Sequence, residues 1–192
     1  MSALGAISFV EIAALIVALI ASYTDIRTGK ILNVLTFPAA LVGICCRAAM
    51  YAMQNPDSQV ASAAAGAINA VCGWLLAVFI MAAMKFFLKN LGHGDTKLLG
   101  ALGAFVGPAM VVGTFLYFCF TYAIFSCAWL AMTLPWRQLT SAYMAGSIAG
   151  VNLERFNEVR KRAIPIAPFI AAGLLLMILL KQPTLGFLGF HP

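Results

Sequence analysis

The sequence predicts an all-α membrane protein built as a bundle of about six transmembrane helices. The chain of 192 residues is 63% hydrophobic and only 9% charged, an apolar share well above that of soluble domains. Several of its apolar stretches reach about 18 residues or more, the length that is needed to cross a bilayer. Basic residues gather in the segments between those stretches, as they do in membrane proteins with a defined topology.

Polar turns divide the first half of the apolar sequence into three helices. The first is expected over about residues 4–23, and the polar turn 25–30 follows it. The second covers about residues 33–53, and the turn-forming segment 54–58 ends it. The third covers about residues 60–84.

The second half of the chain contains a long apolar stretch that fits two spans. Residues 98–136 are too many for one crossing, and Gly107-Pro108 is the natural break because proline ends or kinks a helix. We therefore expect a short fourth helix over about 96–106 and a fifth over 109–134. A charged loop, a sixth helix and a tail are expected over about 135–163, 164–180 and 181–192. The whole chain, 1–192, is expected to form one membrane domain.

The distribution of positive charge predicts which side of the membrane each loop occupies. Ten of the twelve Lys and Arg residues fall in segments 25–30, 85–97 and 135–163, which six alternating spans place on one side. The other side receives only Lys181, and Arg47 lies inside a span. The basic side is therefore expected to be cytoplasmic, with both chain ends on the opposite side. Topology thus explains the net charge of +6, and no nucleic-acid partner is expected.

The cysteines do not indicate a metal site or a disulfide framework. All five lie within apolar stretches and none forms a CxxC pair, so small packing residues are the expected role: Cys45, Cys46, Cys72, Cys119 and Cys127.

Two aspartates are the strongest functional candidates. Asp25 and Asp95 fall near helix ends on the predicted cytoplasmic side, and ionisable residues at membrane helices are functional candidates. Each alone has a plainer explanation, Asp95 as a helix cap after a glycine turn and Asp25 as an interfacial charge beside Arg27. Together they favour a pair of carboxyls that shares one proton, because two neighbouring carboxyls cannot both ionise.

Such a pair has a defined chemistry. The ionised carboxylate takes a proton from water, and the water attacks a peptide carbonyl that the protonated carboxyl polarises. This reaction requires no metal, no other cofactor and no covalent intermediate.

Three segments resemble the type IV prepilin peptidases, a family of membrane aspartic proteases. The segment Gly92-His93-Gly94-Asp95-Thr96-Lys97 resembles that family's GxGDxK motif. Asp25 with Ile31-Leu32-Asn33 is similar to its first motif, in which Asp is followed by Ile-Pro-Asn, although leucine replaces the proline here. Residues 164–169 and Gly173 resemble the proline-rich entry to the family's last helix.

The resemblance implies a function and a site. It implies Asp25 and Asp95 as catalytic residues, with supporting roles for four motif residues: Gly92, Gly94, Lys97 and Asn33. It implies a prepilin substrate, whose basic leader is removed at the cytoplasmic face of the inner (plasma) membrane. The chain resembles the short branch that serves Flp/Tad pili, because it lacks the cysteine-rich insert of the enzymes that also N-methylate, and no methyltransferase activity is expected.

Other functions and several residue roles stay open. An archaeal-type preflagellin peptidase is similar in size, and a proton-coupled transporter subunit would use the same carboxylates as a relay. A transporter would place them near the midplane, in broken helices of symmetric halves. A purely structural membrane subunit is the third alternative. His93 is expected to act locally or to tune the pair, Arg47 to snorkel, and segment 154–162 to be solvated or to bind the leader. Glu11 receives no role.

Overall fold

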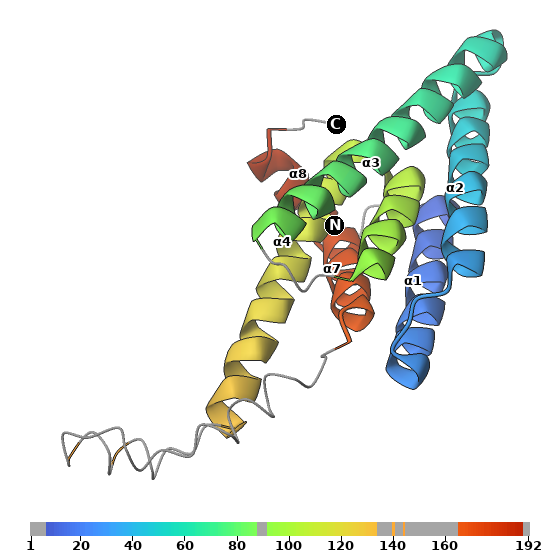
Figure 1. The fold of residues 1–192 in the computed structure, drawn as a ribbon. Helices are drawn as coiled ribbons and strands as arrows, with labels where there is room; N and C mark the ends of the chain where they lie inside the picture. Colours follow the sequence, from blue (N-terminus) through green and yellow to red (C-terminus); the bar gives the residue numbers. More distant parts are fainter. Residues whose placement is uncertain (1–6, 88–91, 134–139, 141–143, 145–164, 190–192) are drawn as a thin grey trace. The chain divides into compact units, whose positions relative to one another are not determined.

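A computed structural model describes residues 7–87, 92–133, 140, 144 and 165–189, and its elements are all helical. They are α1 (Phe9–Thr28), α2 (Asn33–Gln54), the short 3-10 helix η1 (Pro56–Ser58), α3 (Gln59–Phe87), α4 (His93–Thr133), α7 (Ala167–Leu179) and α8 (Lys181–Phe187) (Figure 1). The predicted all-α membrane fold is confirmed. Helices α1, α2, α3 and α4 are each long and apolar enough to cross a membrane, and α7 is a shorter apolar helix.

Most of the predicted helices are found, with two corrections. The first helix was expected to end near residue 23, but α1 continues to Thr28, where the N–H of Gly29 caps it by donating to the carbonyl of Asp25. Residues 181–192 were expected to form a tail, but α8 occupies 181–187. Most of the predicted loop 135–163 lies outside the described residues.

Contacts divide the chain into two compact units. The first contains residues 1–121 and 165–192, and the second contains residues 122–164. All of the predicted site residues belong to the first unit. Within it, α2 runs alongside α3, and α1 packs on α7 and α2 (Figure 1).

The expected break in the long apolar stretch is present in α4. Gly107 has φ 77° and ψ 174°. This backbone conformation interrupts the helix, and residues other than glycine rarely adopt it. Pro108 follows it and has no backbone N–H to donate. The break therefore divides α4 into a short first half, which begins at His93, and a longer second half.

Arg47 binds the backbone at this break. Its Nη1 donates to the carbonyl oxygen of Phe105 at 2.8 Å, and its Nε donates to Oδ1 of Asn69 at 2.9 Å. One arginine thus joins α2, α3 and α4, and it supplies a partner to a carbonyl next to the helix break. The expectation that Arg47 snorkels to the membrane surface is wrong, because its guanidinium points to these internal acceptors.

Helices α1 and α7 form an antiparallel pair. Three alanines of α1 and three larger residues of α7 are fully buried: Ala14, Ala18, Ala21, Ile170, Leu174 and Met177. At the start of α1, Glu11 accepts the N–H of Ser8 at 2.9 Å and pairs with Nζ of Lys181 at 2.6 Å. This buried carboxylate therefore joins the first helix to the start of α8.

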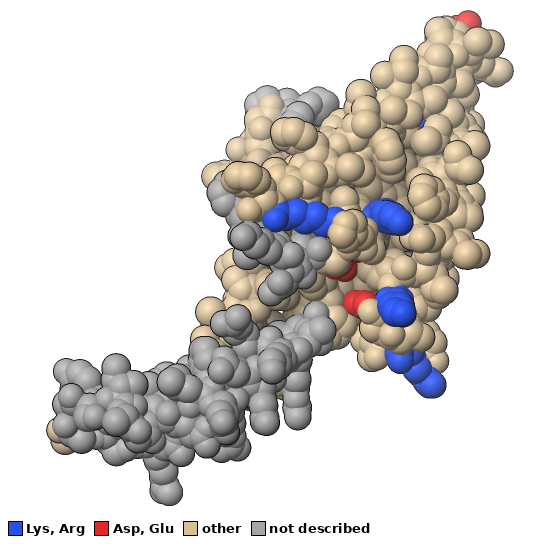
Figure 2. Space-filling view, in the orientation of Figure 1, with Lys and Arg blue, Asp and Glu red and all other residues tan. Residues whose placement is uncertain are grey.

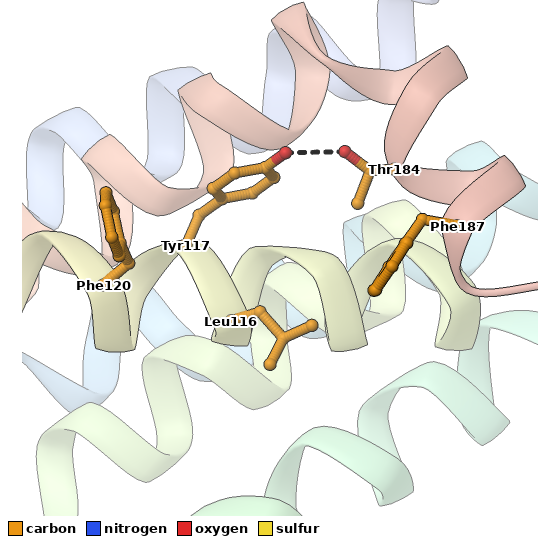
Figure 3. A pocket seen from close by; sticks show the side chains of 5 residues that line it. All are labelled: Leu116, Tyr117, Phe120, Thr184 and Phe187. Carbon is orange, nitrogen blue, oxygen red and sulfur yellow. Dashed lines mark hydrogen bonds between the residues drawn. The ribbon is translucent and has the colours of Figure 1, made fainter.

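A small apolar pocket lies between α4 and α8. Figure 3 shows the hydroxyls of Tyr117 and Thr184 directed at one another, and their oxygens are 2.7 Å apart. Leu116, Phe120 and Phe187 complete the lining (Figure 3). None of these five residues belongs to the sequence motifs, so this pocket is separate from the predicted site.

Replacing Arg47 should destabilise the bundle. We expect Arg47→Met to lower the free energy of unfolding by about 1–3 kcal/mol, because it leaves a buried carbonyl without its donor. Thermal unfolding in detergent micelles measures this change. Arg27→Met is the matched control, because Arg27 is exposed and surface changes usually stay within about 0.5 kcal/mol. Equal melting temperatures for the two variants would contradict the role of Arg47.

Candidate functional site

Asp25 lies in the last turn of α1 and is buried, with 8% of its surface exposed. Its Oδ2 accepts the backbone N–H of Ala167, the first residue of α7, at 3.2 Å. The antiparallel pairing of α1 and α7 explains this contact, because it brings the end of one helix to the start of the other. Asp25 is therefore part of the helix packing, and the prediction that it lies in a polar turn after the first helix is wrong, because α1 continues to Thr28.

Asp95 is the third residue of α4 and is also buried, with 6% exposed. Its carboxylate accepts a hydrogen bond from the backbone N–H of Gly92, the residue before the helix. A side chain at position 92 would collide with this contact, since an added Cβ would lie 2.7 Å from Oδ2 of Asp95. Asp95 thus occupies the place of the acidic residue in a capping box and is not the N-cap residue itself.

The two aspartates lie in one region of the molecule. Asp25 is near enough to Asp95 for its charge to act on that carboxyl, as is the ammonium group of Lys85. The structure therefore brings together two buried carboxyls that are 70 positions apart in the sequence, each with one oxygen held by a backbone N–H.

Three further motif residues bring α4 close to α2 and to the connection before it. Nζ of Lys97 donates to Oδ1 of Asn33 at 2.8 Å and lies 5.6 Å from the ring centroid of Phe37. An added Cβ at Gly94 would lie 3.0 Å from Cβ of Ile31, so the glycine allows the start of α4 to approach the connection just before α2. The two sequence motifs therefore meet in space through α2 and α4.

Several basic side chains lie on the same face as acidic side chains (Figure 2). Figure 2 shows Lys and Arg atoms grouped near acidic atoms on one part of an otherwise mostly uncharged face. Arg27 and Lys30 are exposed, whereas Lys85 and Lys97 are half-buried. Basic side chains at the ends of membrane helices fit a surface that meets lipid headgroups. This position agrees with the charge pattern of the sequence.

The predicted site residues lie at the ends of three helices. Asp25, Asp95, Gly92, Gly94, Lys97 and Asn33 all lie in the described part of the chain, and the structure gathers them at the ends of α1, α2 and α4. His93 is exposed at the first position of α4. Segment 154–162 lies outside the described residues. The described residues contain no group of three or more His, Cys, Asp or Glu side chains that could hold a metal ion.

Sequence reasoning missed the backbone of Ala167 as a member of this site. The sequence predicts a helix entry at Ile164-Pro165-Ile166-Ala167-Pro168-Phe169, but it does not predict the contact of this segment with Asp25. The available signal was the pair of prolines around Ala167, which leaves few N–H groups at the start of that helix.

The fold and the site define a class, a polytopic helical membrane protein with paired carboxylates at its helix ends. Comparison with known proteins then shows the family. Residues 12–127 match the type IV leader peptidase family, and the chain belongs to it.

Two curated relatives agree with this family. The chain is 29% identical over 170 residues to a prepilin leader peptidase/N-methyltransferase of Burkholderia pseudomallei strain 1026b, and equally to that of strain K96243. The matched region is 88% of this chain and 45% of each relative, so the chain spans less than half the length of these relatives. No solved structure matches the chain.

The bond between Lys97 and Asn33 should contribute little to stability. We expect a double-mutant cycle with Asn33→Ala and Lys97→Met to give a coupling free energy of about 0.2–1 kcal/mol, because the pair is open to solvent. Thermal unfolding of the parent, both single variants and the double variant measures it. A coupling above about 2 kcal/mol would show that the pair is a structural support of the fold, contrary to this expectation.

Proposed function

We propose that this chain is a membrane aspartic endopeptidase that removes the basic leader of type IV prepilins at the cytoplasmic face of the inner membrane. The observation that carries the proposal is the proximity of the buried carboxyls of Asp25 and Asp95 in a member of the type IV leader peptidase family. The Burkholderia pseudomallei relatives are prepilin leader peptidase/N-methyltransferases, which supports the same substrate class.

In this proposal the two carboxyls have different roles in hydrolysis, one as general base and one as hydrogen-bond donor. In this mechanism one carboxyl works in its ionised form and the other in its protonated form, since two neighbouring carboxyls resist double ionisation. The ionised carboxylate accepts a proton from water as the water oxygen attacks the scissile carbonyl carbon, and the protonated carboxyl donates a hydrogen bond to the carbonyl oxygen. The tetrahedral intermediate then collapses, and the proton taken from water goes to the leaving amine.

The motif residues would hold this pair in place. The N–H of Gly92 fixes one oxygen of Asp95, and Gly94 lets α4 approach Ile31, which lies two residues before α2. Lys97 and Asn33 tie the same two helices through their hydrogen bond. Supporting residues of this kind act on the position of the carboxyls rather than on the scissile bond.

Two features support a narrower assignment to the Flp-type, peptidase-only branch. The connection between α1 and α2 covers only residues 29–32, which leaves no room there for the cysteine-rich insert expected of methylating members. The five cysteines lie in the helices α2, α3 and α4. We therefore propose peptidase activity without N-methyltransferase activity.

The rival function from another class is a proton-coupled transporter subunit. The break in α4 at Gly107 resembles the discontinuous helices of transporters. However, Arg47 and Asn69 lie at that break, whereas Asp25 and Asp95 lie at helix ends. The acidic pair is thus separated from the broken backbone, an arrangement that favours surface hydrolysis over a relay through the membrane.

Loss of either aspartate should abolish cleavage. We expect Asp25→Asn and Asp95→Asn each to reduce kcat by a factor of about 10²–10⁴, the usual contribution of a general acid or base. The assay follows cleavage of a purified Flp-type prepilin by the full chain in detergent. Asp57→Asn is the matched control, because Asp57 is exposed in η1 and should keep parental activity. Parental cleavage by both active-site variants would refute the pair, and proton uptake into liposomes without cleavage would favour the transporter.

Cleavage should have a bell-shaped dependence on pH. A pair that works with one shared proton is inactive when both carboxyls are protonated at low pH and when both are ionised at high pH. Initial rates of prepilin cleavage, measured at constant ionic strength across pH 4–9, test this expectation. Activity that rises without limit toward high pH would instead indicate a hydroxide or metal-bound water as the nucleophile.

A further inference from the structure

We propose that the backbone N–H of Ala167 is a positioning group for Asp25, which fixes the rotation of the carboxylate so that Oδ1 faces the reacting water. This inference rests on the proposed peptidase function. It adds the start of α7 to a site that the aspartate motifs alone would place on α1, α2 and α4.

The first support is the contact itself. The N–H of Ala167 lies 3.2 Å from Oδ2 of Asp25, although the two residues are 142 positions apart. Both are buried, with Ala167 fully inaccessible and Asp25 8% exposed. A backbone N–H can only donate, so Oδ2 is held as an acceptor and Oδ1 remains available to water or to the shared proton.

The second support is the local sequence of α7. Pro168 has no N–H, and the N–H of Phe169 donates to the carbonyl of Ile166 at 3.0 Å. Ala167, the first residue of the helix, directs its donor at a side chain of another helix. The positive end of a helix also favours the ionised form of a carboxylate, which is the form that accepts a proton from water.

The third support is the register of the α1–α7 pair. Glu11 precedes Asp25 by 14 residues, and Ala167 precedes Lys181 by the same number. One polar contact therefore lies at each end of the α1–α7 pair, and the two contacts are about 21 Å apart along the helices. A slip of one turn, about 5.4 Å, would break both contacts. The Glu11–Lys181 ion pair thus holds the register that keeps the N–H of Ala167 against Asp25.

The test removes this one N–H. The full chain is made by cell-free synthesis into lipid nanodiscs with lactic acid in place of Ala167, which converts the amide to an ester and keeps the side chain. We expect kcat for a Flp-type prepilin to fall about tenfold, because a hydrogen bond to a charged group is lost. KM should stay within about twofold, because Ala167 is placed against Asp25 and not against the substrate.

The matched control is the same ester at Phe169. It removes the donor to Ile166 in the same helical turn and should keep kcat within about twofold. Ala167→Gly is a second control by ordinary mutagenesis. Glycine keeps the backbone N–H that contacts Asp25, so this variant should keep kcat within about twofold.

The outcomes separate this inference from the proposed function. If the parent cleaves, Asp25→Asn does not, and the Ala167 ester has parental kcat, the positioning role is wrong and the peptidase stands. Equal losses of kcat in the two esters would also overturn it, because they would show only a weakened helix start. If the parent does not cleave, the proposed function itself fails.

Discussion

The register between α1 and α7 is the constraint on which the rest of the site depends. Apolar packing between membrane helices is weakly directional, since lipid tails are as apolar as the side chains they replace. The buried alanines of α1, such as Ala14 and Ala18, allow close approach but would also allow sliding. The polar contacts of Asp25 with Ala167 and of Glu11 with Lys181 remove that freedom. The position of one aspartate is therefore set by contacts at both ends of a helix pair.

The other aspartate, Asp95, lies on a helix that is broken at Gly107. The break at Gly107 frees backbone carbonyls inside the bundle, where such groups must find partners within the protein. Arg47 binds the carbonyl of Phe105 and, through Asn69, the neighbouring helix. The first half of α4 is therefore a separate short helix that runs from His93 to the break at Gly107. Asp95 lies at the start of this short half, where the N–H of Gly92 holds it.

The sequence was most informative where local chemistry decides the structure. Apolar length predicted the spans, Gly107-Pro108 predicted the break, and the two acidic motifs predicted which residues gather. It was least informative about pairs of distant residues. Glu11 received no role because its partner is 170 positions away, and Arg47 was expected to snorkel because its acceptor is a carbonyl that only the break exposes. The membrane sidedness stays a prediction from the charge pattern.

The one departure from the family's first motif has a local physical explanation. Leucine stands at position 32 where the family pattern has proline, and Leu32 is the residue that precedes α2, with φ −72° and ψ 126°. Proline fixes φ near −65°, so leucine already holds the backbone angle that proline would impose. Asn33 consequently still begins the helix and still accepts from Lys97. The residue that contacts the other motif is preserved, and the proline contributes stiffness rather than a contact.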